Sequence, residues 1–437
     1  MQPKKQDLFA RRRARFLAGM KEGVALFIAS PEAFFGHDTA YRYRPDPDFQ
    51  HLTGFAEPGA IAVLDADRKV YTLFVRRRDR VRESWEGRRA GPEGAVADFG
   101  ADAAYPTEEL AERLPELIRS ASVLHVALGI SPDSDRLVLE LLARFRREAR
   151  DPRRGPSLLK DPTDLLHEMR LFKEPEEVAL LERSAAIAAR AHRDAMRLAA
   201  PGRYEYQLEA VIEKRFKAEG ASGPAYSTIV GSGENATILH YVENRRQMRG
   251  GELVLVDAGC EYEGYASDIT RTFPVSGTFS RVQQRFYEVV LAAQTAAIAA
   301  VRPGTPFDDV HAAARDVLID GLIDLGLLKG RRSSVKAHQS DQRFILHRTS
   351  HWLGRDVHDR GRYMDASGSS RPLEAGMVLT VEPGLYVRTD EAKVPSKFLG
   401  LGVRIEDDVL VTADGNRVLT DGVPRRPDEL SELMGRK

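Results

Sequence analysis

Two aspartates beside short apolar segments constrain this chain more than any other feature of its sequence. Asp257 directly follows the apolar run Leu253 to Val256, and Asp268 directly precedes the run Ile269 to Phe273. Both runs are typical of strands, and two glycines in their connection favour a hairpin. We therefore expect the two aspartates to meet across one antiparallel pair. Bare anions among Val, Ile and Leu are costly to bury, so something positive is expected between them.

Three more side chains that can bind a metal ion lie downstream, each beside a strand-like segment. They are His351, Glu382 and Glu406. For any one of them alone, an acid or histidine facing water is the simpler interpretation. Together with the two aspartates, however, the order Asp, Asp, His, Glu, Glu is typical of a site for two metal ions. Four carboxylates and one imidazole, with no thiolate, suit a hard divalent ion better than structural zinc.

The motifs around these five side chains are similar to those of a known family. They are Val256-Asp257-Ala258-Gly259, Ser267 to Pro274, Ser350-His351-Trp352-Leu353-Gly354, Val381-Glu382-Pro383-Gly384 and Arg404-Ile405-Glu406-Asp407. The sequence resembles the Xaa-Pro aminopeptidases (aminopeptidase P) of the pita-bread metallopeptidases, family M24. The resemblance extends to Thr228 to Asn235 and, in the N-terminal third, to Tyr43 to Gly54 and Trp85 to Arg89.

The resemblance implies a role for each of the five residues. Asp268 and Glu406 would bridge two divalent ions, Asp257 would bind one ion, and His351 and Glu382 would complete the other. Mn²⁺ is the family's usual metal, and Co²⁺ or Zn²⁺ could occupy the same site. Two ions lower the pKa of a bridging water, and the resulting hydroxide can attack a peptide carbonyl. Glu382 would help accept its proton.

The reaction that the resemblance implies is release of the N-terminal residue from peptides with proline second. The bond before proline is a tertiary amide crowded by the ring, which explains a dedicated enzyme. The expected substrate-binding residues are His240, His347, His358, Tyr386 and Trp85, and the expected catalytic residues are His240, His358, Glu382, Arg404 and Asp38. A structural role stays the alternative for each histidine, and a plain ion pair is the alternative for Arg404.

Two of these residues lie in the N-terminal third. Asp38 matches a family aspartate that reaches toward the active site, and Trp85 matches an aromatic residue that a neighbouring subunit offers. The resemblance therefore implies a homodimer or homotetramer in which subunits close each other's sites. For Trp85, a partly buried surface tryptophan is the alternative interpretation.

The length of 437 residues exceeds what one core usually covers, so two domains are expected. Residues 1–165 are predicted as an α/β domain and residues 166–437 as an α+β domain, a curved antiparallel sheet backed by helices. The resemblance makes these a creatinase-like domain and a pita-bread catalytic domain. Residues 152–162 read as a linker. The predicted helices and strands outside the hairpin are strands at 24–29, 60–65, 70–75 and 123–128, and helices at 110–120, 136–147, 176–198, 206–219, 281–301 and 306–325.

Composition narrows the partners and the compartment. Lys plus Arg (65) equals Asp plus Glu (65), so no nucleic acid or other polyanion is implied. The single cysteine, Cys260, fits a reducing compartment, and no segment has membrane-spanning length. The basic residues 1–20 are expected to form an amphipathic helix with a solvated arginine face. We therefore expect a cytoplasmic protein that acts on peptides without contacting a membrane.

Two alternatives to the aminopeptidase remain open at this stage. A prolidase would use the same fold and metals on Xaa-Pro dipeptides, and a non-catalytic pita-bread protein would bind peptides only. One departure from the family pattern also stands out. Arg348 lies where the family often has a small residue, with Arg355 and Arg360 nearby. We hypothesise that these arginines tune the outer subsites toward acidic or longer peptides.

Overall fold

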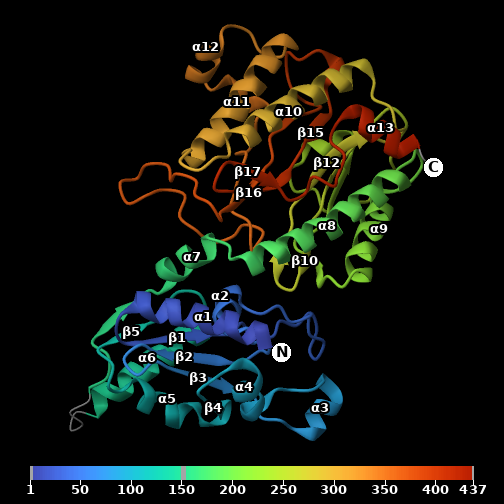
Figure 1. Cartoon of the computed structure of the whole chain (residues 1–437). Helices are drawn as coiled ribbons and strands as arrows, with labels where there is room; N and C mark the ends of the chain where they lie inside the picture. Colours follow the sequence, from blue (N-terminus) through green and yellow to red (C-terminus); the bar gives the residue numbers. More distant parts are fainter. Residues whose placement is uncertain (1–2, 149–153, 436–437) are drawn as a thin grey trace. The chain divides into compact units, whose positions relative to one another are not determined.

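The chain folds into two compact units, Met1–Met169 and Arg170–Lys437, in a computed structural model that describes residues 3–148 and 154–435 (Figure 1). The predicted two-domain fold, α/β followed by a pita-bread domain, is confirmed. The units divide inside α7 (Thr163–Leu171), a few residues after the boundary that we expect at residue 165.

A six-stranded mixed sheet forms the centre of the first unit, in the order β4-β3-β2-β1-β5-β6. Its strands are β1 (Val24–Ile28), β2 (Ile61–Asp65), β3 (Val70–Val75), β4 (Ala103–Pro106), β5 (Val123–His125) and β6 (Leu158–Lys160). Its helices are α1 (Pro3–Met20), α2 (Pro47–Thr53), α3 (Arg80–Glu86), α4 (Gly91–Phe99), α5 (Leu110–Ile118) and α6 (Pro132–Arg147). Strands β1 to β3 are antiparallel, whereas β4, β5 and β6 join their neighbours in parallel.

The sheet is buried on both faces at β1, β2 and β3, because alternate residues of these strands enter two different cores. In β1, Ala25 and Phe27 pack in a core that includes Phe16 of α1. Val24 and Leu26 pack in a second core with residues of α5 and α6. Continuously apolar strands such as β1 and β2 are therefore explained by helices on both sides.

Two expectations for the first unit need correction. The arginine face of α1 is only partly solvated, since Arg12 and Arg13 are buried. Arg13 donates to the Leu52 carbonyl at 3.1 Å, and its guanidinium lies over the Tyr71 ring. The expected linker contains β6, which pairs with β5 and so belongs to the sheet. Residues 152 and 153 of that linker lie outside the described residues.

The second unit combines short antiparallel strand groups with long helices. Its helices are α8 (Pro175–Leu198), α9 (Glu205–Ala218), α10 (Arg281–Ala300), α11 (Phe307–Asp324), α12 (Arg332–Ala337) and α13 (Pro427–Gly435). Its strands are β7 (Gly223–Pro224), β8 (Ile229–Ser232), β9 (Leu253–Asp257), β10 (Cys260–Tyr262), β11 (Tyr265–Ala266), β12 (Thr270–Pro274), β13 (Val378–Val381), β14 (Gly384–Val387), β15 (Leu401–Arg404), β16 (Asp407–Val411) and β17 (Asn416–Val418). One large core joins the apolar faces of the long helices to the strands.

The predicted antiparallel pair is β9 with β12, in a register that places Asp257 opposite Thr270. Its connection is more elaborate than a simple turn, because β10 and β11 form a small hairpin of their own. Glu263 and Gly264 turn this hairpin with positive φ values of 49° and 78°. At Gly259 an added Cβ would lie 1.6 Å from the Ser267 carbonyl oxygen, so only glycine allows the chain to pass itself here.

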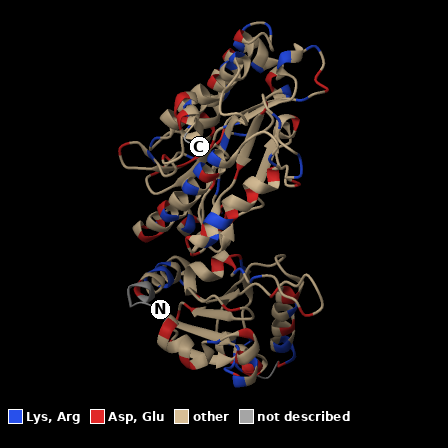
Figure 2. Cartoon of the chain, turned by 90° about the vertical axis from the view of Figure 1, so that its right-hand side faces the viewer, with Lys and Arg blue, Asp and Glu red and all other residues tan. Residues whose placement is uncertain are grey.

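Charges of both signs are interspersed over each unit (Figure 2), in agreement with the equal numbers of acidic and basic residues. Within the described part of the chain, no helix combines the length and the hydrophobicity that a membrane crossing needs.

Candidate metal centre

Three of the five predicted metal-binding side chains form one tight cluster in the second unit. Asp268, His351 and Glu406 each offer one ligand atom, and these atoms all lie within 4.8 Å of one another. Asp268 and Glu406 are buried, and His351 is half-buried. Carboxylates and imidazole that converge in this way are a donor set for a divalent cation.

Backbone pairing brings the five residues together from distant parts of the chain. Asp257 ends β9, and Asp268 lies just before β12, its partner strand. The Glu406 amide donates to the Thr270 carbonyl at 3.0 Å, which holds Glu406 beside the same strand.

The segment around His351 runs along β13 and supplies the other side of the cluster. The Thr380 amide donates to the His351 carbonyl at 2.9 Å, and the Glu382 amide donates to the Thr349 carbonyl at 2.8 Å. His351 and Glu382 are thereby held as neighbours, with His351 Nε2 lying 3.7 Å from Glu382 Oε1 and 3.5 Å from Asp268 Oδ2.

Tyr226 also belongs to this site, although it is not among the predicted residues. Its hydroxyl lies 2.5 Å from Asp257 Oδ1 and also contacts Asp268 Oδ1. A phenol has one hydrogen to donate, so the two carboxylates face the same proton. Tyr226 follows β7 with no metal-binding motif around it, and nothing in its local sequence would have indicated this contact.

Burial is the largest cause of the raised carboxyl pKa values at this site, and repulsion between the acids adds to it. Burial and the neighbouring Asp268, Glu382 and Asp257 raise the pKa of Glu406 well above its usual range. Burial also raises the pKa of Glu382 to about 7, although His351 and Arg404 oppose this shift. The protein alone therefore provides too little positive charge for its carboxylates.

The histidine of the cluster is oriented for ligation. Its Nδ1 lies 3.1 Å from the Trp352 carbonyl oxygen and so carries the proton that it donates there, which directs Nε2 to the acids. Although burial lowers its pKa, Asp268 and Glu382 raise the pKa of His351 to about 9. The imidazole thus behaves as a group that faces excess negative charge.

The residues of this cluster fit a metal ion. The cluster has converging oxygen and nitrogen donors, raised carboxyl pKa values and a histidine with its outward nitrogen already bonded. The one thiol does not compete. Cys260 is buried against Ser184, its Sγ lying 3.4 Å from the Ser184 carbonyl oxygen, and burial raises its pKa.

Arg404 is the cation that the protein itself places at the cluster. It is buried, and its Nη2 donates to Asp257 Oδ2 at 2.5 Å. Its Nη1 donates to the Tyr386 hydroxyl at 2.8 Å, and that hydroxyl lies 2.8 Å from His347 Nε2. Tyr386 is fully buried, so it reaches the site through Arg404 and His347 and has no surface of its own for a substrate.

The other predicted site residues are more exposed. The His358 ring lies 4.2 Å from the His351 ring, edge to face, and His358 and His240 are both exposed. Burial, His351 and His240 together lower the pKa of His358, which places the three imidazoles near one another. Asp38 and Trp85 lie in the first unit, where both are exposed.

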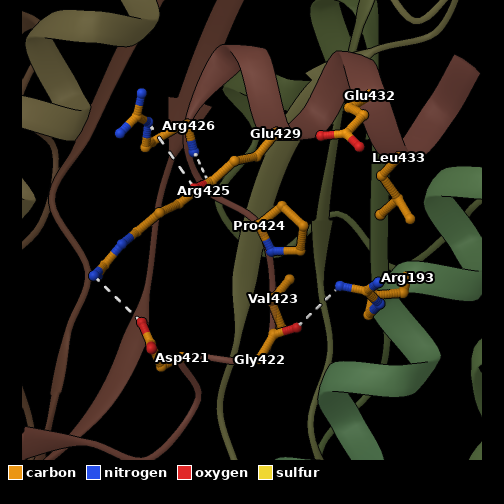
Figure 3. A pocket seen from close by; sticks show the side chains of 10 residues that line it. All are labelled: Arg193, Asp421, Gly422, Val423, Pro424, Arg425, Arg426, Glu429, Glu432 and Leu433. Carbon is orange, nitrogen blue, oxygen red and sulfur yellow. Dashed lines mark hydrogen bonds and ion pairs between the residues drawn. The ribbon is translucent and has the colours of Figure 1, made fainter.

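Pockets of the second unit lie both beside the predicted site residues and away from them. One has a volume of about 540 Å³ and includes His347 in its lining. Another, of about 430 Å³, lies between Arg193 of α8, the segment 421–426 and α13 (Figure 3). None of the predicted site residues lines this second pocket, and several of its acidic and basic side chains pair with one another, as Arg425 does with Asp421 and Arg426 with Glu429.

Comparison with known proteins agrees with this geometry. The pattern of Metallopeptidase family M24 matches residues 179–413, and that of the Aminopeptidase P, N-terminal domain matches residues 9–126. The chain is similar to the Xaa-Pro aminopeptidase of Escherichia coli, with 44% identity over 430 residues that cover 98% of this chain and 97% of that protein.

Two solved structures are similar over nearly the whole chain. The aminopeptidase PepP of Pseudomonas aeruginosa superimposes with a TM-score of 0.97 and 44% identity, covering 98% of each chain. A zinc-substituted Escherichia coli aminopeptidase P in complex with product gives a TM-score of 0.96 and 44% identity, covering 99% of each chain.

Proposed function

The chain belongs to Metallopeptidase family M24 and is a metal-dependent exopeptidase of the Xaa-Pro aminopeptidase kind, and on that premise we propose how its own residues perform the reaction. Its substrates are peptides with proline second, from which it releases the first residue. The observation that carries the proposal is the convergence of Asp268, His351 and Glu406 within 4.8 Å.

We propose that the site holds two divalent ions. Asp268 and Glu406 would be shared by both ions, Asp257 would bind one, and His351 and Glu382 would complete the other. Mn²⁺ is our first choice of metal, with Co²⁺ or Zn²⁺ able to use the same donors. When bound, the ions supply an activated water and polarise the scissile carbonyl.

The remaining chemistry belongs to side chains of the chain itself. Glu382 accepts a proton from the attacking water and returns it to the proline nitrogen, which must be protonated to leave. His240 and His358 donate hydrogen bonds to the substrate as charge develops on its carbonyl oxygen. Arg404 orients the Asp257 carboxylate through their 2.5 Å contact and links the site to Tyr386 and His347.

We also propose the setting in which the enzyme works. The 86% exposure of Trp85 is consistent with a homodimer or homotetramer that covers this ring, and Asp38 is proposed to act at the active site. A single, buried cysteine fits the reducing cytoplasm. Nucleic acids and membranes are not expected as partners.

The experiment is hydrolysis of a matched pair of peptides, Xaa-Pro and Xaa-Pro-Yaa, with Mn²⁺ added. We expect turnover of the longer peptide and its loss in Asp268→Ala. A control, Asp320→Asn, removes an acid of α11 that pairs with Arg332 on the surface, and it should leave turnover unchanged. Turnover of the dipeptide alone would indicate a prolidase, and no turnover of either peptide would indicate a binding protein.

A further inference from the structure

The 540 Å³ pocket adjoins the candidate metal centre through one shared residue. His347 lines the pocket, and its Nδ1 lies 3.5 Å from Glu382 Oε2. The rest of the lining comes from α11 and from the segment 341–348, so the two sites meet at a single side chain. A peptide held at the metal centre therefore has this pocket as a neighbour.

Side chains of α11 and of the segment 341–348 give the pocket its charge. Asp308, His311 and Arg315 follow one another at three- and four-residue spacing, which places them in one row on the helix. Burial, Arg348 and Arg315 lower the pKa of His311 to about 4, so two guanidinium groups face this imidazole. The imidazole is neutral near pH 7, and the cationic groups are Arg315 and Arg348.

The two arginines differ in how firmly they are held. Arg315 forms two hydrogen bonds to Asp341, a carboxylate that is 1% exposed, and is fixed by them. Arg348 is held by an ion pair from its Nη2 to Asp308, and the two side chains are 60% and 41% exposed. Exposed pairs of this kind contribute little, so Arg348 can exchange partners at small cost.

Arg348 also differs from Arg355 and Arg360, the other two arginines of the hypothesis about the outer subsites. Arg355 is buried, and its guanidinium lies 4.5 Å from the Tyr265 ring centroid. Arg360 is exposed and does not line the pocket. The hypothesis of outer-subsite arginines therefore reduces to Arg348.

We propose that this pocket binds a carboxylate on the part of the peptide that follows proline, and that Arg348 recognises it. The inference rests on the proposed function. An aminopeptidase admits one residue before the cleaved bond and an open-ended chain after it. The pocket suits that chain, because its rim is exposed at Leu346 and Arg348 while Ile345 and Leu346 offer an apolar wall for a side-chain stem.

The carboxylate can come from an acidic side chain or from the peptide's own C-terminus, and capped peptides separate the two sources. Xaa-Pro-Glu-amide against Xaa-Pro-Gln-amide tests the side chain. Xaa-Pro-Gln with a free C-terminus against its amide tests the terminus. We expect kcat/KM to be higher for at least one charged member, by roughly two- to fivefold, and the difference to shrink with added salt.

Substitutions at Arg348 and at Asp308 should change this preference in opposite directions. Arg348→Gln should bring the charged-to-neutral ratio of kcat/KM to about one, and Arg348→Lys should restore part of it. Asp308→Asn removes the competing carboxylate and should raise the ratio above that of the native enzyme. The matched control is Arg332→Gln, which removes an exposed, ion-paired arginine of α12 and should not change the ratio.

The outcomes separate the two proposals. If no Xaa-Pro-Yaa peptide is hydrolysed, the proposed function fails. If all are hydrolysed and the ratio is the same in the native enzyme, Arg348→Gln and Arg332→Gln, the enzyme stands and the pocket assignment is wrong. A charge preference that follows Xaa instead of Yaa would also overturn it. Calorimetric binding of Pro-Glu-amide and Pro-Gln-amide gives the same comparison without turnover.

Discussion

At the scale of single residues, Tyr226 shows how a neutral group can organise an ionic site. Its hydroxyl contacts Asp257 and Asp268, which come from two different positions in the chain. Burial, followed by both aspartates and Glu406, raises the pKa of this phenol well above its usual range, so it remains a donor. A group that orients ligands through hydrogen bonds commonly changes metal affinity or activity when it is removed.

Tyr226→Phe is therefore expected to weaken Mn²⁺ binding or kcat/KM by roughly 10- to 100-fold while the fold is retained. Calorimetric titration with Mn²⁺ and circular dichroism would measure both. The control is Tyr287→Phe, another buried tyrosine, whose hydroxyl donates to the Arg425 carbonyl at 2.7 Å. Equal effects of the two substitutions would contradict a role at the metal centre.

His192 gives a prediction about acid stability. It is fully buried, with Nε2 lying 2.9 Å from the Ala258 carbonyl oxygen, and burial lowers its pKa from 6.5 to about 4. Between these two pH values the unfolded chain binds a proton that the folded chain does not. The free energy of unfolding should therefore fall as pH falls through this window, by about 3 kcal/mol from this residue.

Urea unfolding at pH 7.5, 5.5 and 4.5 measures this contribution. His192→Gln should be less stable than the native protein at pH 7.5 but should lose less stability on acidification. His338→Gln, at an exposed histidine, should follow the native profile. Identical slopes for native protein and His192→Gln would show that this histidine takes up its proton in the folded state too.

Residues differ in how far the sequence can predict them. The four acids and the histidine of the metal set lie beside apolar strand segments, and a charged or polar residue in such a place can be recognised from the sequence. Tyr226 and the buried Arg12 and Arg13 are not visible, because a tyrosine or arginine is compatible with many environments. Their roles depend on which backbone carbonyl or carboxylate the fold brings near, as with the Leu52 carbonyl and Arg13.

At the scale of elements, the long helices and the β9–β12 pair follow the sequence pattern closely. Periodic apolar residues mark α8, observed at Pro175–Leu198, and α10, observed at Arg281–Ala300. The shortest strands, by contrast, cannot be predicted from the sequence pattern. β6, β10 and β11 have three, three and two residues, and no period can be recognised over such lengths. Their pairing depends on contacts distant in sequence.

The crossing at Gly259 supplies a test at this scale. In Gly259→Ala the new methyl group would overlap the Ser267 carbonyl oxygen, and Asp268 would have to move with it. We expect a loss of about 3 kcal/mol or more in unfolding free energy, together with loss of Mn²⁺ binding. Gly415→Ala, at a position with open space around it, should change neither. Native-like metal binding in Gly259→Ala would refute this view of the crossing.

At the scale of the whole molecule, the open question is how many chains assemble. Two domains follow from length, but an oligomer depends on surface complementarity that one sequence does not display. Trp85 is 86% exposed on α3, an unusual cost for so large an apolar ring. We predict that light scattering will show a dimer or tetramer and that Trp85→Ser will weaken it. An active monomer would remove this role from Trp85.

Because Cys260 is buried, the rate at which its thiol is labelled reports local opening of the protein. Its thiol is the only one in the chain, and it lies in β10 between the two aspartates that flank the small hairpin. A thiol reagent can reach it only when this hairpin opens, so the labelling rate counts those openings. Metal ions that connect Asp257 to Asp268 would lower this labelling rate. Because Cys260 reacts so slowly, a cysteine added on the surface could be labelled selectively.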